Sequence, residues 1–138
     1  MIRGVFAVTV LCAIASSSGA APSDTAAEAQ AADRQTIELY RQGKFAEALA
    51  EAERAVALAE QAHGPDHVEV GRALYNLATL YGVVRRFRDN EATLVRARAI
   101  FERHPDAAAP TILAGNAPEG TALAHTLVSL YQVRASHG

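Results

Sequence analysis

The stretch that decides the fold of this chain runs from residue 43 to residue 59 and reads GKFAEALAEAERAVALA. A second stretch, FRDNEATLVRARAIF at residues 87–101, follows the same pattern 42 residues further along. At that spacing Phe45 corresponds to Phe87, and the Arg-Ala pair at 54–55 corresponds to the pair at 96–97. A fixed period in this range is typical of helical solenoids, whose units are each too thin to bury their own apolar face. We therefore predict an all-α fold of stacked helix pairs.

Apolar residues recur every three to four positions through most of the chain, which predicts amphipathic helices. We expect five helices, over residues 25–42, 45–63, 67–84, 87–104 and 119–134, and no strand. Thr25 and Glu28 have the spacing of a capping box at the start of the first helix. Gly64 and Pro65 should end the second helix, and Asp66 should cap the third.

The side chains predicted to face inward follow this period. In the first two helices they are Ala29, Ala32, Leu39, Tyr40, Phe45, Ala48, Leu49, Ala52, Ala55, Val56 and Ala59. In the other three they are Val70, Ala73, Leu74, Leu77, Ala78, Tyr81, Val84, Phe87, Leu94, Ala97, Phe101, Leu123, Leu127, Leu130, Tyr131 and Arg134.

The first residues of the chain have the pattern of a secretory signal peptide. One basic residue, Arg3, precedes an apolar run over residues 5–15, and Ser18 and Ala20 suit cleavage before residue 21. We expect residues 1–20 to be a signal peptide, with an uncleaved membrane anchor as the alternative. Cleavage would remove Cys12, the single cysteine, which fits an oxidising compartment.

The charge balance argues against a strong electrostatic field. The chain has 13 Lys and Arg against 15 Asp and Glu, a net charge of −2. Such a chain is not expected to bind nucleic acid or an anionic membrane through its overall charge. Six arginines, Arg85, Arg86, Arg88, Arg96, Arg98 and Arg103, lie close together in sequence, but acidic residues are interleaved with them and favour a solvated face.

Three segments together resemble a known repeat family: residues 43–48 with the pair 54–55, the sequence GPDH at 64–67, and ALYNLATLY at 73–81. They are similar to tetratricopeptide repeats, in particular to the 42-residue variety of kinesin light chains and many bacterial proteins. The resemblance covers about residues 30–138 and is specific between residues 43 and 99. It implies a short right-handed α-solenoid of about two and a half repeats. Repeat 1 would span about residues 29–66 and repeat 2 about 67–105, followed by a loop at 105–118 and a capping helix at about 119–134.

The sequence departs from the family pattern in three places. Gln35 and Thr36 stand where an apolar and a small residue are expected, so the packing of the first helix is the least certain. Asn90 stands where repeat 1 has the small Ala48, which should loosen or shift the fourth helix. The spacing from Tyr81 to Tyr131 is eight residues longer than the period, and we place this insertion in the loop at 105–118.

In this family the first helix of each repeat lines a concave groove, and the resemblance implies which residues face it. The predicted groove residues are Arg41, Arg72, Tyr75, Asn76, Thr79, His125 and Ser129, with Arg34, Ile37, Val83, Thr126 and Gln132 nearby. The amide of Asn76 could bond the main chain of an extended peptide, and Arg41 and Arg72 could pair with a ligand carboxylate. The alternative is that these are ordinary solvated helix residues.

The sequence offers no candidate for catalysis, cofactor binding or metal binding. His63 and His67 are four residues apart, but Gly64 and Pro65 break the helical spacing that a metal pair would need. No glycine-rich phosphate loop and no supported Ser-His-Asp arrangement occurs. We therefore predict a non-enzyme without cofactors.

These observations predict an exported interaction module, periplasmic or secreted, that binds a peptide or partner protein in its groove. An acidic segment or a free C-terminus is the predicted ligand chemistry. The alternatives are self-association and service as an accessory subunit of an envelope assembly.

Overall fold

The computed structural model describes residues 22–107 and 122–135, with side chains described over residues 24–107 and 126–135. Within these ranges the chain forms five helices and no strand, which confirms the all-α prediction. The helices are α1 (Pro22–Arg41), α2 (Phe45–His63), α3 (Val68–Val83), α4 (Phe87–Arg103) and α5 (Ala122–Ala135). The predicted signal peptide and residues 108–118 of the predicted loop lie outside the described residues. None of the described helices has the length and apolar character needed to cross a bilayer.

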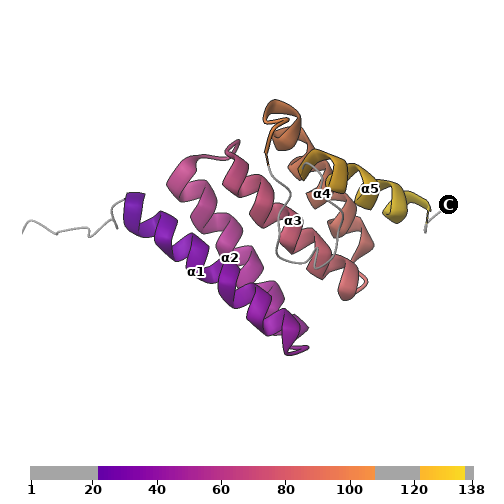
Figure 1. The fold of residues 1–138 in the computed structure, drawn as a ribbon. Coiled ribbons are helices and arrows are strands. Elements are labelled where there is room, and N and C mark those ends of the chain that lie inside the picture. The colour runs from indigo at the N-terminus through magenta and orange to yellow at the C-terminus, as the bar shows by residue number, and fades with distance from the viewer. Residues whose placement is uncertain (1–21, 108–121, 136–138) are drawn as a thin grey trace, which may run out of the picture.

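The helices pack in the order in which they occur, each against the next (Figure 1). This succession of neighbouring helix pairs is consistent with a short solenoid of the predicted kind. Two side-chain hydrogen bonds also reach across it, one from α1 to α3 and one from α3 to α5. The first helices of successive pairs are therefore linked along one side of the stack.

The period of 42 residues is visible in the backbone of the two helix turns. In the first turn, Gly43 N–H donates to the carbonyl of Tyr40 and Lys44 N–H donates to the carbonyl of Leu39. Arg85 and Arg86 make the same two bonds 42 residues later. Gly43 (φ 74°) and Arg85 (φ 62°) both have the left-handed backbone that closes such a turn. The repeat therefore extends to individual hydrogen bonds.

One of the predicted helix ends is confirmed, and two of the predicted N-terminal caps are wrong. Gly64 has a φ of 87° and ends α2, as predicted. The N-cap of α3 is His67 rather than Asp66: its Nδ1 accepts from Glu69 N–H at 3.2 Å, whereas Asp66 pairs with Arg103 at 2.9 Å. The predicted capping box at Thr25 is also wrong, because α1 already begins at Pro22 and Thr25 is buried inside it.

The core of the second repeat is built around one large ring. Phe101 is fully buried, and its ring lies against Gly71, where a Cβ atom would come within 2.8 Å of Phe101 Cε1. The equivalent positions of the first repeat hold Ala59 and Ala29, both buried. A large and a very small side chain in repeat 2 thus replace two alanines in repeat 1. The second repeat carries more buried hydrophobic volume.

The role of Asn90 in packing differs from the prediction that it would loosen or shift α4. Instead of only loosening α4, its buried amide donates from Nδ2 to the carbonyl of Ala78 at 2.7 Å and links α4 to α3. Gly82 makes room for it, since a Cβ atom there would lie 2.8 Å from Asn90 Nδ2. Repeat 1 has Tyr40 and Ala48 at these two positions, the reverse arrangement of large and small.

The inward face was predicted well in α2 and α3 and less well at the ends. In α1, Thr36 is fully buried, with its hydroxyl satisfied by the carbonyl of Ala32 at 2.9 Å, so it acts as the small residue that the pattern requires. In α5, Leu130 is buried as predicted, but Leu127 and Tyr131 are 45% and 75% exposed. Phe45 is also more exposed than expected, because it lies at the start of α2 against the edge of the Tyr40 ring.

Candidate functional site

The most promising site for a ligand is a hollow between α3, α4 and α5. It has a volume of about 370 Å³ and is open to solvent. Its lining combines aliphatic, aromatic and uncharged polar groups: Tyr75, Thr79, Gly82, Val83, Asn90, Leu94, Ser129, Gln132 and Val133. A peptide could find both apolar contact and hydrogen-bond partners here.

One hydrogen bond joins two residues that line this hollow. The hydroxyl of Tyr75 on α3 lies 3.2 Å from Ser129 Oγ on α5, and Tyr75 is largely buried. Thr79, one turn along α3, donates from Oγ1 to the carbonyl of Tyr75 at 3.0 Å. The structure thus brings together three of the predicted groove residues from two helices that are separated in sequence by α4. Their role in binding stays a prediction.

The other predicted groove residues lie elsewhere. Arg72 is paired with Glu69 on its own helix at 2.7 Å, and Arg41 is exposed at the end of α1. Neither lines the hollow. His125 belongs to α5, but its side chain lies outside the described residues.

Asn76 is placed differently from a solvated groove residue. It is 0% exposed, and its Nδ2 donates to Asp33 Oδ1 on α1 at 3.3 Å. Its Oδ1 is buried and has no hydrogen-bond partner among the described residues. The amide therefore joins α1 to α3 inside the stack. A role for Asn76 in peptide binding stays a prediction.

Comparison with known proteins agrees with this geometry. The family model described as Tetratricopeptide repeat matches residues 36–103, which covers the end of α1 and all of α2, α3 and α4. The match supports a tetratricopeptide repeat protein. No curated protein matches the chain. Tetratricopeptide repeats are in general protein–protein interaction modules and form a non-catalytic fold, which fits the prediction of a non-enzyme.

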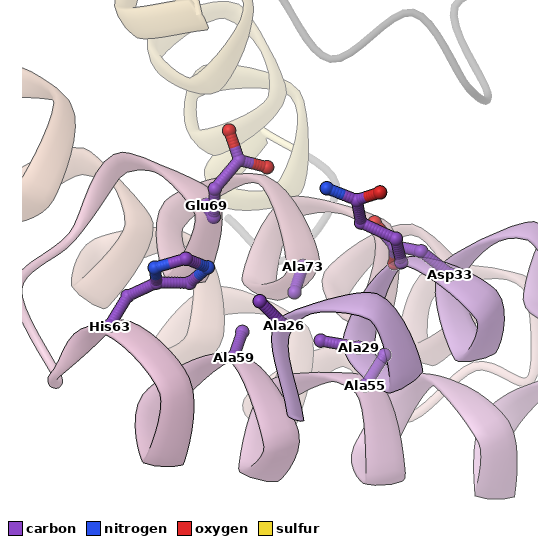
Figure 2. A pocket seen from close by; sticks show the side chains of 9 residues that line it. Ala26, Ala29, Asp33, Ala55, Ala59, His63, Glu69 and Ala73 are labelled. Carbon is purple, nitrogen blue, oxygen red and sulfur yellow. The ribbon is translucent and has the colours of Figure 1, made fainter. Parts of the chain in front are cut away.

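A second, smaller cavity lies between α1, α2 and α3 (Figure 2). Five alanine methyl groups gather at its centre, with His63 and Glu69 on one side and Asp33 on the other. Its volume of about 20 Å³ leaves room for roughly one water molecule. This cavity is therefore a packing defect between alanine-rich helices and not a site for a peptide or cofactor.

Asp33 at the rim of this cavity has a pKa raised above its usual value. The main cause is desolvation by burial, and the nearby Glu69 carboxylate adds to it, while the Asn76 hydrogen bond and Arg72 act in the opposite direction. The folded chain therefore holds the Asp33 proton at a pH where the unfolded chain has released it. Stability is lost as the pH rises from the ordinary Asp pKa, about 3.9, through the raised one.

We expect Asp33→Asn to raise the melting temperature at neutral pH, because the variant keeps an acceptor for Asn76 and removes the desolvated charge. The difference from the parent should shrink as the pH falls through the titration of Asp33. Thermal unfolding followed by circular dichroism across this pH range measures it. Glu38→Gln, on the exposed side of α1, is the matched control and should show no such trend. A D33N variant that melts below the parent at neutral pH would contradict this account.

His63 and His67 lie side by side where α2 ends and α3 begins. Their rings stack at a centroid distance of 4.5 Å, and His67 Nδ1 is used as the cap of α3. Over the residues with described side chains, no group of three or more His, Cys, Asp or Glu side chains is placed to hold a metal ion.

Four residues of the hollow were missed by sequence analysis. Three of them, Gly82, Asn90 and Leu94, lie at the end of α3 and on α4, and the fourth is Val133 on α5. The resemblance directed attention to the first helix of each tetratricopeptide repeat, and α4 is a second helix. The available signal was Asn90, a polar residue at a position that the repeat reserves for a small one.

Proposed function

We propose that this chain is an exported, non-enzymatic interaction module that binds an extended peptide segment of a partner protein in the hollow between α3 and α5. The Tyr75–Ser129 contact carries the proposal, since it joins two predicted groove residues that line a hollow of suitable size. Main-chain hydrogen bonds to groups such as Thr79 and Gln132 would orient the peptide, and Val83 and Leu94 would supply apolar contact.

Export to the periplasm or to the outside of the cell is part of the proposal. It is supported by the basic and apolar pattern of residues 1–20 and by the absence of cysteine from the rest of the sequence. An intact-mass measurement of the protein recovered from an envelope fraction tests it, because cleavage before residue 21 removes a defined mass. A retained leader would favour the membrane anchor.

A bulky substitution at the rim of the hollow tests the binding site. Val83 lines the hollow and is 38% exposed, whereas Val95 on α4 does not line it and is 37% exposed. Short random peptides would be selected on the full chain by display, and the affinities of the enriched sequences measured by fluorescence anisotropy. We expect Val83→Trp to weaken binding about tenfold, by filling space that the peptide needs, and Val95→Trp to leave it unchanged. Equal affinity for the two variants would place the binding surface elsewhere.

Self-association is a second candidate function, and it is favoured by exposed apolar residues on α5. Leu127, Val128 and Tyr131 are all exposed there, a concentration of apolar surface that another protein surface could cover. Sedimentation velocity of the full chain at increasing concentration separates the two uses. A strict monomer that binds selected peptides supports the peptide-binding module, and concentration-dependent dimers favour a structural subunit.

A further inference from the structure

The turn between α3 and α4 carries an arginine cluster that the proposed function does not use. Arg85, Arg86 and Arg88 border a hollow of about 390 Å³ together with Phe87 and Asp89. The guanidinium carbon of Arg85 lies 5.8 Å from the centre of the Phe87 ring. This hollow is separate from the one between α3 and α5, since the two share no lining residue.

The three arginines make different interactions within the described part of the chain. Arg86 donates from Nε to Asp89 Oδ2 at 2.7 Å and lies over the Tyr81 ring at 4.6 Å, so it is used in the structure of the turn. Arg85 and Arg88 are exposed, and neither is paired there with a carboxylate. Two guanidinium groups are therefore available at one hollow, and the aromatic contact of Arg85 limits the positions that its side chain takes.

The first turn of the stack serves as an internal comparison. It makes the same backbone hydrogen bonds, but it has Gly43, Lys44 and Ala46 where the second turn has Arg85, Arg86 and Arg88. Arg85 is the one non-glycine residue with a left-handed backbone among the described residues, a conformation that glycine adopts without strain. The arginines also stand at the start of α4, where positive charge opposes the helix dipole. The second turn thus has a less stable sequence than its counterpart.

Arg85 and Arg88 are exposed and lower the stability of the turn, so their presence is best explained by a ligand that they bind. Guanidinium groups take carboxylates through paired N–H donors, and an aromatic ring beside them can cover the apolar part of a side chain. We propose that the hollow at the α3–α4 turn is a second docking surface, which binds an acidic segment of a partner protein through Arg85 and Arg88. This proposal does not rest on peptide binding between α3 and α5.

An acidic protein segment fits this surface better than a membrane or a nucleic acid does. The described residues leave two guanidinium groups available at this hollow, which are too few to follow the row of charges on an extended polyanion. The whole chain has a net charge of −2, which gives no long-range attraction to a phosphate backbone or to anionic lipid. A short run of carboxylates needs only the local pair of arginines.

The test uses the full chain and a labelled peptide of alternating glutamate and serine, with the glutamine counterpart as the neutral probe. We expect the glutamate peptide to bind, with an affinity that falls as salt is added. The R85G/R88A variant should bind about tenfold more weakly, because two charge-assisted contacts are removed. Its melting temperature should be higher than that of the parent, because the second turn then has glycine and alanine as in the first.

The matched control is R54A/R96A, which removes two charges from equivalent exposed positions of the two repeats. This variant should keep the affinity of the parent for the glutamate peptide. The proposal is overturned if R85G/R88A binds as well as the parent, if the control loses as much, or if the parent does not bind the peptide. Preferential binding to phosphatidylglycerol vesicles or to single-stranded DNA would also overturn it. A lower melting temperature of R85G/R88A would contradict the argument from the strained turn.

Discussion

Phe101→Ala is expected to destabilise the fold by about 3–5 kcal/mol. The ring is 0% exposed and is the largest fully buried side chain of the described residues. Its removal loses the transfer free energy of the ring and leaves a cavity against Gly71 and Ile100, which α3 and α4 can close only in part. Since small domains have a total stability of about 5–15 kcal/mol, the variant should be close to unfolding at ambient temperature.

Urea unfolding followed by circular dichroism measures the loss. Phe87→Ala is the matched control, because it removes the same side chain from the same helix at a position that is only partly buried. It should cost much less than F101A. If the two variants lose similar stability, the second repeat does not depend on the Phe101 ring.

Gly71→Ala is expected to destabilise the fold by about 1–3 kcal/mol. The added methyl group would lie 2.8 Å from Phe101 Cε1 and 3.1 Å from Ile100 Cγ2, and both side chains are buried with little room to move. A loss of stability on this change would be specific to the buried site. In an exposed helix the same change stabilises by up to about 1 kcal/mol, because alanine favours the helix more than glycine does.

A double-mutant cycle attributes the loss to the Phe101 ring. In a Phe101→Leu background the smaller side chain leaves space for the methyl group, so Gly71→Ala should cost less there than in the parent chain. Unfolding free energies of the four proteins supply the comparison. A stabilising Gly71→Ala, or a cost that does not change with residue 101, would show that the close contact does not limit packing.

The parts of the fold that sequence predicted are those that depend on local chemistry and on the repeat. The turn at Gly43 and the helix end at Gly64 follow from the backbone freedom of glycine, and both were located correctly. The inward faces of α2 and α3 follow from a helical period that persists over many residues. The turn at Arg85 follows only from the predicted ends of the helices on either side, because arginine itself gives no signal for a left-handed residue.

The candidate site was predicted less completely, because its geometry depends on contacts between distant residues. Nothing in the pattern of α1 indicates that Asp33 meets Asn76 of α3, since both are polar residues that a helix surface could equally expose to water. The exposure of Tyr131 had a different cause. Its spacing predicts an inward face, but a helix at the end of the described stack has a neighbour on one side only. Periodicity identifies a face without identifying what covers it.

The contrast between Ala59 and Phe101 has a mechanical consequence for the whole molecule. The N-terminal pair of helices is joined by small methyl groups around a gap, whereas in the next pair a buried ring packs closely against Gly71. Local stability is therefore uneven along the stack. Under heat or a pulling force, we expect the pair α1–α2 to detach from the rest of the stack before α3 separates from α4. The surfaces proposed to receive partners both include residues of α4, so this part of each surface would keep its shape while the N-terminal end loosens.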